Sequence, residues 1–437
     1  MSRAALKFAL LVLPLCLADM LSLFDLRPDK FAHDRYVYSR KHMKMRKFGL
    51  DSSVVGNFTS LDFMAMANEH GYPAEEHIVK TADGYKLRIH RIPGSPSKPK
   101  APGKPVVFFQ HGVFASSDTW ILMGPDHDLA YMLADIGYDV WLGNARGNTY
   151  SRSHVKLSPN HNPKFWQFSY HEIALFDMPA SIDYILKETQ QPSLIYVGHS
   201  MGTSISYVLL STKPEYNKKV KLVISLAPVA FWHSSPGPFI RLLQYNTAAI
   251  KNFVLNAKIN EIFPLTAAST HFGKIACRDQ SIFQEICVNF IYYTAGYNPH
   301  QLNASALPHL FSFFPAGGSV KTLIHYSQNL NTGDFKMYDY GAKENFLRYK
   351  QRDAPSYNLS NVVAPVALFY GKGDAISAPG NTIELSKKLS NVVAMESISD
   401  TRFSHLDFLF SRNLKELLNN RLIELAENLL KQANIVR

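Results

Sequence analysis

In the segment Leu194-Ile195-Tyr196-Val197-Gly198-His199-Ser200-Met201-Gly202, four strand-forming residues run directly into Gly-His-Ser-Met-Gly, in which a glycine lies two positions to each side of the serine. An apolar pattern of helical period follows it at once. At such a strand-to-helix turn, the glycines let the backbone pass close by while the serine hydroxyl stays exposed on a strained turn. The pattern therefore predicts that Ser200 is a nucleophile. The alternative is an ordinary tight turn between a strand and a helix.

Strand and helix patterns alternate on both sides of this segment. Strands are predicted at residues 106–110, 138–142, 220–226 and 363–370, and helices near 126–136, near 171–188 and at the C-terminus through residue 430. This alternation predicts a mostly parallel, doubly wound α/β sheet. Ahead of it, alternating residues flank Asp83-Gly84, which predicts a β-hairpin.

The alternation is interrupted once. Residues 228–353 are helical and loop-like, and rich in Phe, Tyr, Leu and Pro. Because this insertion follows the strand after the nucleophile, we interpret it as a cap or lid over the site. The expected organisation is therefore a signal peptide (1–18), an N-terminal arm (19–65), a core in two parts (66–227 and 354–437), and the cap between those parts.

The N-terminus has the features of an export signal. Arg3 and Lys7 precede a short apolar run, and cleavage is expected near Ala18. Export permits disulfides, and Cys277 and Cys287 are the two cysteines that the mature chain keeps, so we expect them to pair. Export also makes three glycosylation sequons usable: Asn57, Asn303 and Asn358. We expect a secreted or lysosomal protein.

Composition narrows the function classes. The chain is 46% hydrophobic and 19% charged, as in ordinary globular enzymes. Its net charge of +11 invites a nucleic-acid role, but the basic residues are dispersed and no nucleic-acid-binding motif accompanies them. Two thiols without a nearby His at ligand spacing do not predict a metal site. After the signal, no apolar run is long enough to span a bilayer.

A serine nucleophile needs a base and an acid that orients the base, in the chain order serine, acid, histidine. The strand predicted at 363–370 leads into Gly371-Lys372-Gly373-Asp374, and His405 lies in the loop before the last helix. We therefore predict Asp374 as the acid and His405 as the base. Asp400 and Asp407 are rival acids, but they share a loop with His405. An Asp in a Gly-rich turn is also often only a turn residue.

The reaction also needs donors for the oxyanion. One predicted donor is the backbone N–H of Met201, directly after the nucleophile. The other is the backbone N–H of Val113, because His111-Gly112 allows close approach after the strand that ends at Gln110. A simple turn at His111-Gly112 is the alternative.

Several motifs together resemble those of a known family. They are Gly71-Tyr72-Pro73, Asp83-Gly84-Tyr85, Gln110-His111-Gly112, the segment from Gly137 to Asn148, the Gly198–Gly202 motif and His405-Leu406-Asp407-Phe408. From about residue 65 onward the chain resembles the gastric and lysosomal acid lipases and their insect relatives. One departure is Met201, where the vertebrate digestive and lysosomal members usually carry Gln.

The resemblance implies an α/β-hydrolase core with a lid-bearing cap. It also implies hydrolysis of triacylglycerols or cholesteryl esters at an oil–water or membrane surface, without a cofactor. The same catalytic residues and oxyanion amides are implied, and the protein is expected to be a monomer. Two alternatives stay open: a carboxylesterase acting on soluble short-chain esters, and a lipid-binding protein without turnover.

Overall fold

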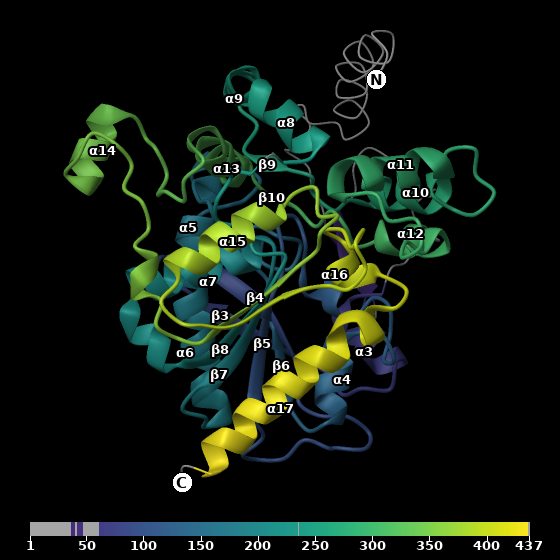
Figure 1. The fold of residues 1–437 in the computed structure, drawn as a ribbon. Coiled ribbons are helices and arrows are strands. Elements are labelled where there is room, and N and C mark those ends of the chain that lie inside the picture. The colour runs from purple at the N-terminus through teal and green to yellow at the C-terminus, as the bar shows by residue number, and fades with distance from the viewer. Residues whose placement is uncertain (1–35, 40–41, 47–60, 235, 436–437) are drawn as a thin grey trace.

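The computed structural model describes residues 36–39, 42–46, 61–234 and 236–435 (Figure 1). Its strands are β1 (Tyr36–Ser39), β2 (His42–Arg46), β3 (Glu75–Lys80), β4 (Lys86–Ile92), β5 (Val106–Gln110), β6 (Asp139–Leu142), β7 (Leu194–His199), β8 (Val220–Leu226), β9 (Glu261–Ile262), β10 (Gly318–Ser319), β11 (Val366–Tyr370) and β12 (Val392–Ser397). Its α-helices are α3 (Phe63–Glu69), α4 (Leu129–Asp135), α5 (Tyr170–Glu172), α6 (Met178–Thr189), α7 (Met201–Thr212), α8 (Pro238–Tyr245), α9 (Thr247–Asn256), α10 (Ala267–Ala276), α11 (Gln284–Ala295), α12 (Leu307–Leu310), α13 (Val320–Thr332), α14 (Ala342–Tyr349), α15 (Pro379–Lys388), α16 (Asp407–Phe410) and α17 (Asn420–Ile435).

Eight strands form one sheet in the order β12-β11-β8-β7-β5-β6-β4-β3. β3 and β4 are the predicted hairpin, and β4 pairs antiparallel with β6. All other pairs in this sheet are parallel. The prediction of a mostly parallel, doubly wound sheet is therefore confirmed. β7, which precedes the predicted nucleophile Ser200, lies between β5 and β8 in the middle of the sheet.

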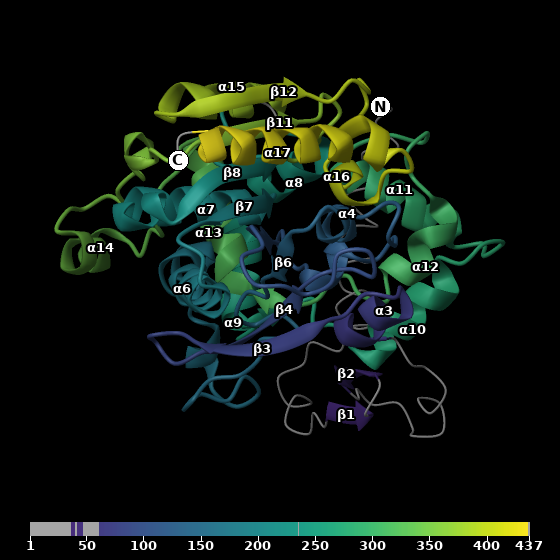
Figure 2. The same ribbon diagram turned by 90° about the horizontal axis from the view of Figure 1, so that it is seen from below.

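Helices cover both faces of the sheet. Successive side chains of a strand point to opposite faces, so each central strand contributes to two cores. In β5, Val107 and Phe109 pack into a core with α3, α4 and α17, whereas Val106 and Phe108 pack into a core with α6, α7 and α15. Figure 2 shows the strands following one another from β12 to β3, with α6 and α7 on one side and α3 and α4 on the other. With both faces buried, β5 and β7 are apolar over their first four residues.

The segment between β8 and β11 contains α8–α14 and the short antiparallel pair β9–β10, which the sequence did not predict. Figure 1 shows α8–α13 gathered above the sheet and α14 to one side. Cys277 at the end of α10 and Cys287 in α11 form a disulfide. Large apolar side chains are exposed along this region, among them Ile282 (85% exposed) and Ile286 (64%).

Other sequence predictions need a correction or lie outside the described part of the chain. The sequence did not predict the edge strand β12 or the helix α15 before it. The predicted signal peptide and the Asn57 sequon lie outside the described residues. Asn303 is half-buried and Asn358 is exposed. Within the described ranges, no helix is both long and apolar enough to cross a bilayer.

Candidate active site

Ser200 occupies a strained turn between β7 and α7. Its backbone has φ 53° and ψ −117°, a conformation that residues other than glycine rarely adopt. The turn is held because the Ser200 amide donates to the Leu226 carbonyl (3.0 Å) and the Ser200 carbonyl accepts from the Thr203 hydroxyl (2.6 Å). The sequence pattern predicted a strained turn with an exposed hydroxyl; the backbone is strained as predicted, but Ser200 is buried.

Both flanking glycines are required by backbone packing. A Cβ on Gly198 would lie 2.7 Å from the carbonyl carbon of Gly202, and one on Gly202 would overlap the carbonyl oxygen of Gln110. The nucleophile turn and the end of β5 therefore contact each other backbone to backbone. This contact brings the loop after β5 next to Ser200.

The structure brings Ser200, His405 and Asp374 together, although in sequence His405 lies 205 positions after Ser200 and 31 after Asp374. His405 Nε2 lies 2.8 Å from Ser200 Oγ, and His405 Nδ1 lies 2.8 Å from Asp374 Oδ2. Asp374 follows β11 and His405 follows β12, so both reach the site from the same end of the sheet as β7. All three residues are buried.

The predicted acid, Asp374, is fixed in orientation by its own loop. Asp374 Oδ1 accepts from the backbone amides of Ile376 (2.8 Å) and Ser377 (2.7 Å), which leaves Oδ2 facing His405. This arrangement keeps a proton on Nδ1 of His405 and leaves Nε2 free to take the proton of Ser200.

The two rival acids do not contact the imidazole in the described contacts. Asp407 Oδ2 instead accepts from the Ser404 amide (2.7 Å) and from the side chain of Asn298 (2.9 Å). Asp400 accepts from the Arg402 amide (2.9 Å) and also from Asn298 (3.1 Å). Both carboxylates therefore bond to the loop that carries His405 and to the segment after α11.

The predicted oxyanion amides flank the nucleophile. Met201 is the first residue of α7, where backbone N–H groups lack partners within the helix and the positive end of the dipole lies. Val113 follows Gly112, and a Cβ on Gly112 would lie 3.2 Å from the Cβ of Ser200. The loop after β5 thus runs beside Ser200, which an oxyanion donor at Val113 would require.

His111 fixes the conformation of this loop. Its Nδ1 donates to the Gly112 carbonyl (2.7 Å), and its Nε2 accepts from the amide of Ala145 (3.1 Å). Burial lowers the pKa of His111 to about 4, so the ring is neutral near neutral pH and keeps one acceptor nitrogen.

His199 contacts the predicted base, His405. Its Nε2 donates to the backbone carbonyl of His405 (3.0 Å), and the two rings lie 4.9 Å apart. Burial and the neighbouring His405 lower the pKa of His199 to about 3. A neutral His199 adds no positive charge beside His405 when that ring takes up a proton. From the sequence alone, nothing marks His199 except its place directly before Ser200.

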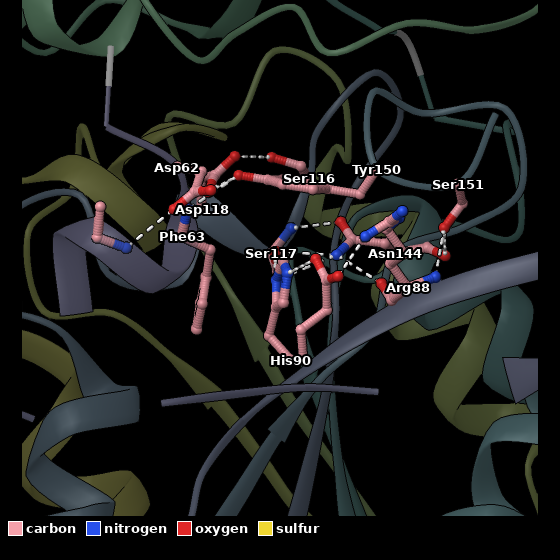
Figure 3. Close-up of polar contacts among 12 residues, drawn as sticks. Asp62, Phe63, Arg88, His90, Ser116, Ser117, Asp118, Asn144, Tyr150 and Ser151 are labelled. Atoms are coloured by element: carbon pink, nitrogen blue, oxygen red, sulfur yellow. Dashed lines mark hydrogen bonds and ion pairs between the residues drawn. The ribbon is translucent and has the colours of Figure 1, made fainter. Parts of the chain in front are cut away.

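A polar network holds the segment that follows Val113 in the loop after β5. Figure 3 shows the contacts of this network. The Asn144 side chain accepts from the Ser117 amide (2.9 Å) and donates to the Arg88 carbonyl (2.9 Å). His90 Nδ1 lies 2.7 Å from the Ser117 hydroxyl. The loops after β5 and β6 are thereby tied to β4.

The same figure shows a buried carboxyl, Asp118, that accepts from the hydroxyls of Ser116 (2.7 Å) and Tyr150 (2.8 Å). Tyr150 in turn accepts from the amide of Phe63 at the start of α3 (3.0 Å). Burial raises the pKa of Asp118 to about 7. From about pH 4 to 7 the folded chain therefore binds a proton here that the unfolded chain releases, so the free energy of unfolding falls as pH rises.

Arg146, in the loop after β6, is a structural ion-pair centre. It donates to Asp177 (2.7 Å) and makes two bonds to Asp83 (2.6 and 2.9 Å), and its guanidinium lies 3.9 Å above the Tyr85 ring. It joins the β3–β4 turn to the start of α6, and no described contact links it to Ser200.

The chemistry of the site follows from this geometry. A buried serine hydroxyl with a base at hydrogen-bond distance, an oriented acid and nearby backbone amides is suited to acyl transfer through a covalent intermediate. Within the described residues, no group of three or more His, Cys, Asp or Glu side chains is arranged to hold a metal ion.

Comparison with known proteins agrees with this architecture. The family described as "Partial alpha/beta-hydrolase lipase region" matches residues 63–124, and the family described as "alpha/beta hydrolase fold" matches residues 105–270. The chain is 37% identical to Lipase 3 of Drosophila melanogaster, over 86% of this chain and 95% of that protein. It is 36% identical to gastric triacylglycerol lipase of Bos taurus, over 84% and 91%. A crystal structure from Sulfolobus solfataricus shares the fold, with TM-score 0.52 and 12% identity over 81% of this chain and 99% of that one.

Proposed function

The chain belongs to the acid lipase family, with the gastric lipases and their insect relatives, and we propose that Ser200, Asp374 and His405 carry out its hydrolysis of lipid esters. The observation that carries the proposal is that His405 lies 2.8 Å from both Ser200 Oγ and Asp374 Oδ2. The proposed substrates are triacylglycerols, with cholesteryl esters as a second class of neutral lipid.

In the proposed reaction, Ser200 Oγ attacks the ester carbonyl while His405 Nε2 takes the hydroxyl proton. The amides of Val113 and Met201 stabilise the oxyanion, and Asp374 stabilises the imidazolium. His405 then protonates the departing alcohol. Water, activated by the same base, releases the fatty acid from the acyl-enzyme and restores the serine.

The cap is proposed to contact the lipid. The insertion between β8 and β11 exposes large apolar side chains, whereas the apolar side chains on both faces of the central sheet are buried under helices. An exposed apolar surface of this kind is typical of interaction with lipid or protein. We propose that acyl chains enter beneath it.

The proposal includes export, to the cell exterior or the lysosome, after cleavage near Ala18. The Cys277–Cys287 disulfide supports an oxidising compartment. Asn303 and Asn358 are proposed as glycosylation sites, and Asn358 is exposed. N-terminal sequencing of the secreted protein, with and without glycosidase treatment, tests cleavage and sequon use.

The activity is tested with emulsified long-chain triacylglycerol from acid to mildly alkaline pH, beside Ser200→Ala. Fatty-acid release that disappears in the variant is expected. Turnover of soluble short-chain esters alone would instead indicate a carboxylesterase. Bound lipid without turnover of either substrate would indicate a lipid-binding protein.

A further inference from the structure

Three backbone segments meet beside the imidazole of His405. Two are the loops that carry the acid and the base, and the third is the segment 295–298 at the end of α11, which belongs to the insertion and not to the sheet. We propose that the segment 295–298 is a positioning element of the catalytic site, setting the distance between His405, Asp374 and Ser200. This inference rests on the proposed function of those three residues.

The carbonyl oxygen of Ala295 joins the two catalytic loops. It accepts from the amide of His405 (3.1 Å) and from the amide of Ala375, directly after Asp374 (3.2 Å). A carbonyl oxygen has two acceptor sites, and here each is used by a different loop. A shift of this oxygen therefore moves the acid and the base together or pulls them apart.

The next residue must be a glycine. Gly296 has φ +121° and ψ 150°, a backbone conformation that favours glycine. A Cβ here would overlap the carbonyl oxygen of Gly373 and lie 3.0 Å from the Cβ of Ser404. The end of α11 thus packs against the acid loop and the base loop without an intervening side chain.

Asn298 extends the contact to the far side of the base loop. It is 1% exposed, and its amide donates to Asp407 (2.9 Å) and Asp400 (3.1 Å). The Asp407 oxygen that accepts from Asn298 also accepts from the amide of Ser404, the residue before His405 (2.7 Å). The side chain of Asn298 therefore holds, through one carboxylate, the backbone that aims the imidazole.

The insertion is then more than a cover. If the insertion moves to open the site, the segment 295–298 must stay in contact with the loops that carry Asp374 and His405. Otherwise the movement separates His405 from Ser200. Losing Asn298 is expected to loosen the base loop while the nucleophile and the oxyanion loop stay in place. Misplacement of a catalytic group by about 1 Å costs on the order of 100-fold in rate, so kcat should fall by about that factor.

Asn345 provides a matched control within the same insertion. It is also 1% exposed, and it donates to the Asp339 carboxylate (2.7 Å) and the Arg352 carbonyl (2.8 Å) in α14 and its flanks. Asn298→Ala and Asn345→Ala each remove a buried amide bonded to a carboxylate, so similar losses in Tm are expected. No described contact links Asn345 to the catalytic loops.

The test measures kcat, KM and Tm on a soluble short-chain ester. We expect kcat to fall about 100-fold in Asn298→Ala, with KM within about twofold, and to stay within about twofold of wild type in Asn345→Ala. Equal kcat values in the two variants, or a change in KM alone, would overturn the inference. A wild-type protein without ester hydrolysis would overturn the proposed function itself.

Asn298→Asp gives a second readout that does not require the alanine variant to fold. The new carboxyl would face Asp400 and Asp407, and it donates a hydrogen only when protonated. Its activity relative to wild type should therefore be highest at acid pH and fall as pH rises. A pH-independent ratio would overturn the inference.

Discussion

Asp374→Asn separates the role of the acid's charge from the role of its shape. Two backbone amides, of Ile376 and Ser377, donate to Oδ1 of Asp374. In the variant only the carbonyl oxygen of the amide can accept those bonds, so its NH2 group faces His405 Nδ1. That nitrogen must then accept, and the imidazole proton moves to Nε2, where it faces Ser200 and blocks proton transfer.

The expected loss follows from the wrong tautomer. In a triad of this geometry the change lowers kcat by about 10⁴, equivalent to about 5.5 kcal/mol of transition-state stabilisation. The assay is kcat on a soluble p-nitrophenyl ester, with Tm measured beside it to show that folding is intact. Asp128→Asn is the control, because one oxygen of Asp128 likewise accepts from two backbone amides, of Met123 (2.8 Å) and Gly124 (3.0 Å), and the other faces a histidine, His127 (2.8 Å). A loss below about tenfold in Asp374→Asn, or an equal loss in Asp128→Asn, would refute the assignment of the acid.

Three further predictions concern stability. Asp118→Asn should raise Tm at pH 7.5 but not at pH 4, because burial raises the pKa of this carboxyl from 3.8 to about 7 and ionising it in the fold costs up to about 4 kcal/mol; equal effects at both pH values would contradict this. Arg146→Lys should lower the free energy of unfolding by about 3–5 kcal/mol, measured in urea, since an ammonium cannot keep the fork of bonds to Asp83 and Asp177; a change below about 1 kcal/mol would show that the fork is dispensable. Cys277→Ser removes the disulfide between cysteines ten positions apart and should lower the free energy of unfolding by about 2–3 kcal/mol through loop entropy. A wild-type protein that reducing agent destabilises far less than that would contradict this.

The sequence predicted the centre of the sheet and the nucleophile turn because both follow from local patterns. Apolar runs before Gly198 and from residue 106 indicated buried parallel strands, and the structure has β7 and β5 there. The glycines two positions from Ser200 were recognised from the local motif, although the backbone contact that requires Gly202 is with the distant Gln110.

Other features depend on contacts that no local pattern carries. β12 is an edge strand with half-exposed, alternating burial, and it ends in Glu396-Ser397, so its apolar signal is weak. The bonds from His405 and Ala375 to Ala295 join residues far apart in the chain, and alanine has no side chain that marks the site. The role of Asn298 is equally hidden, because a buried amide next to two aspartates is recognised only once the loops are in place.

Ser200 is proposed as the nucleophile of a lipid ester hydrolase. The most direct measurement is inactivation of the secreted protein with a long-chain alkylphosphonate ester, followed by peptide mass spectrometry. We expect one adduct, on the peptide that contains Ser200, in proportion to the loss of triacylglycerol hydrolysis, and no adduct in Ser200→Ala. An adduct on another residue, or hydrolysis that persists in Ser200→Ala, would contradict the claim.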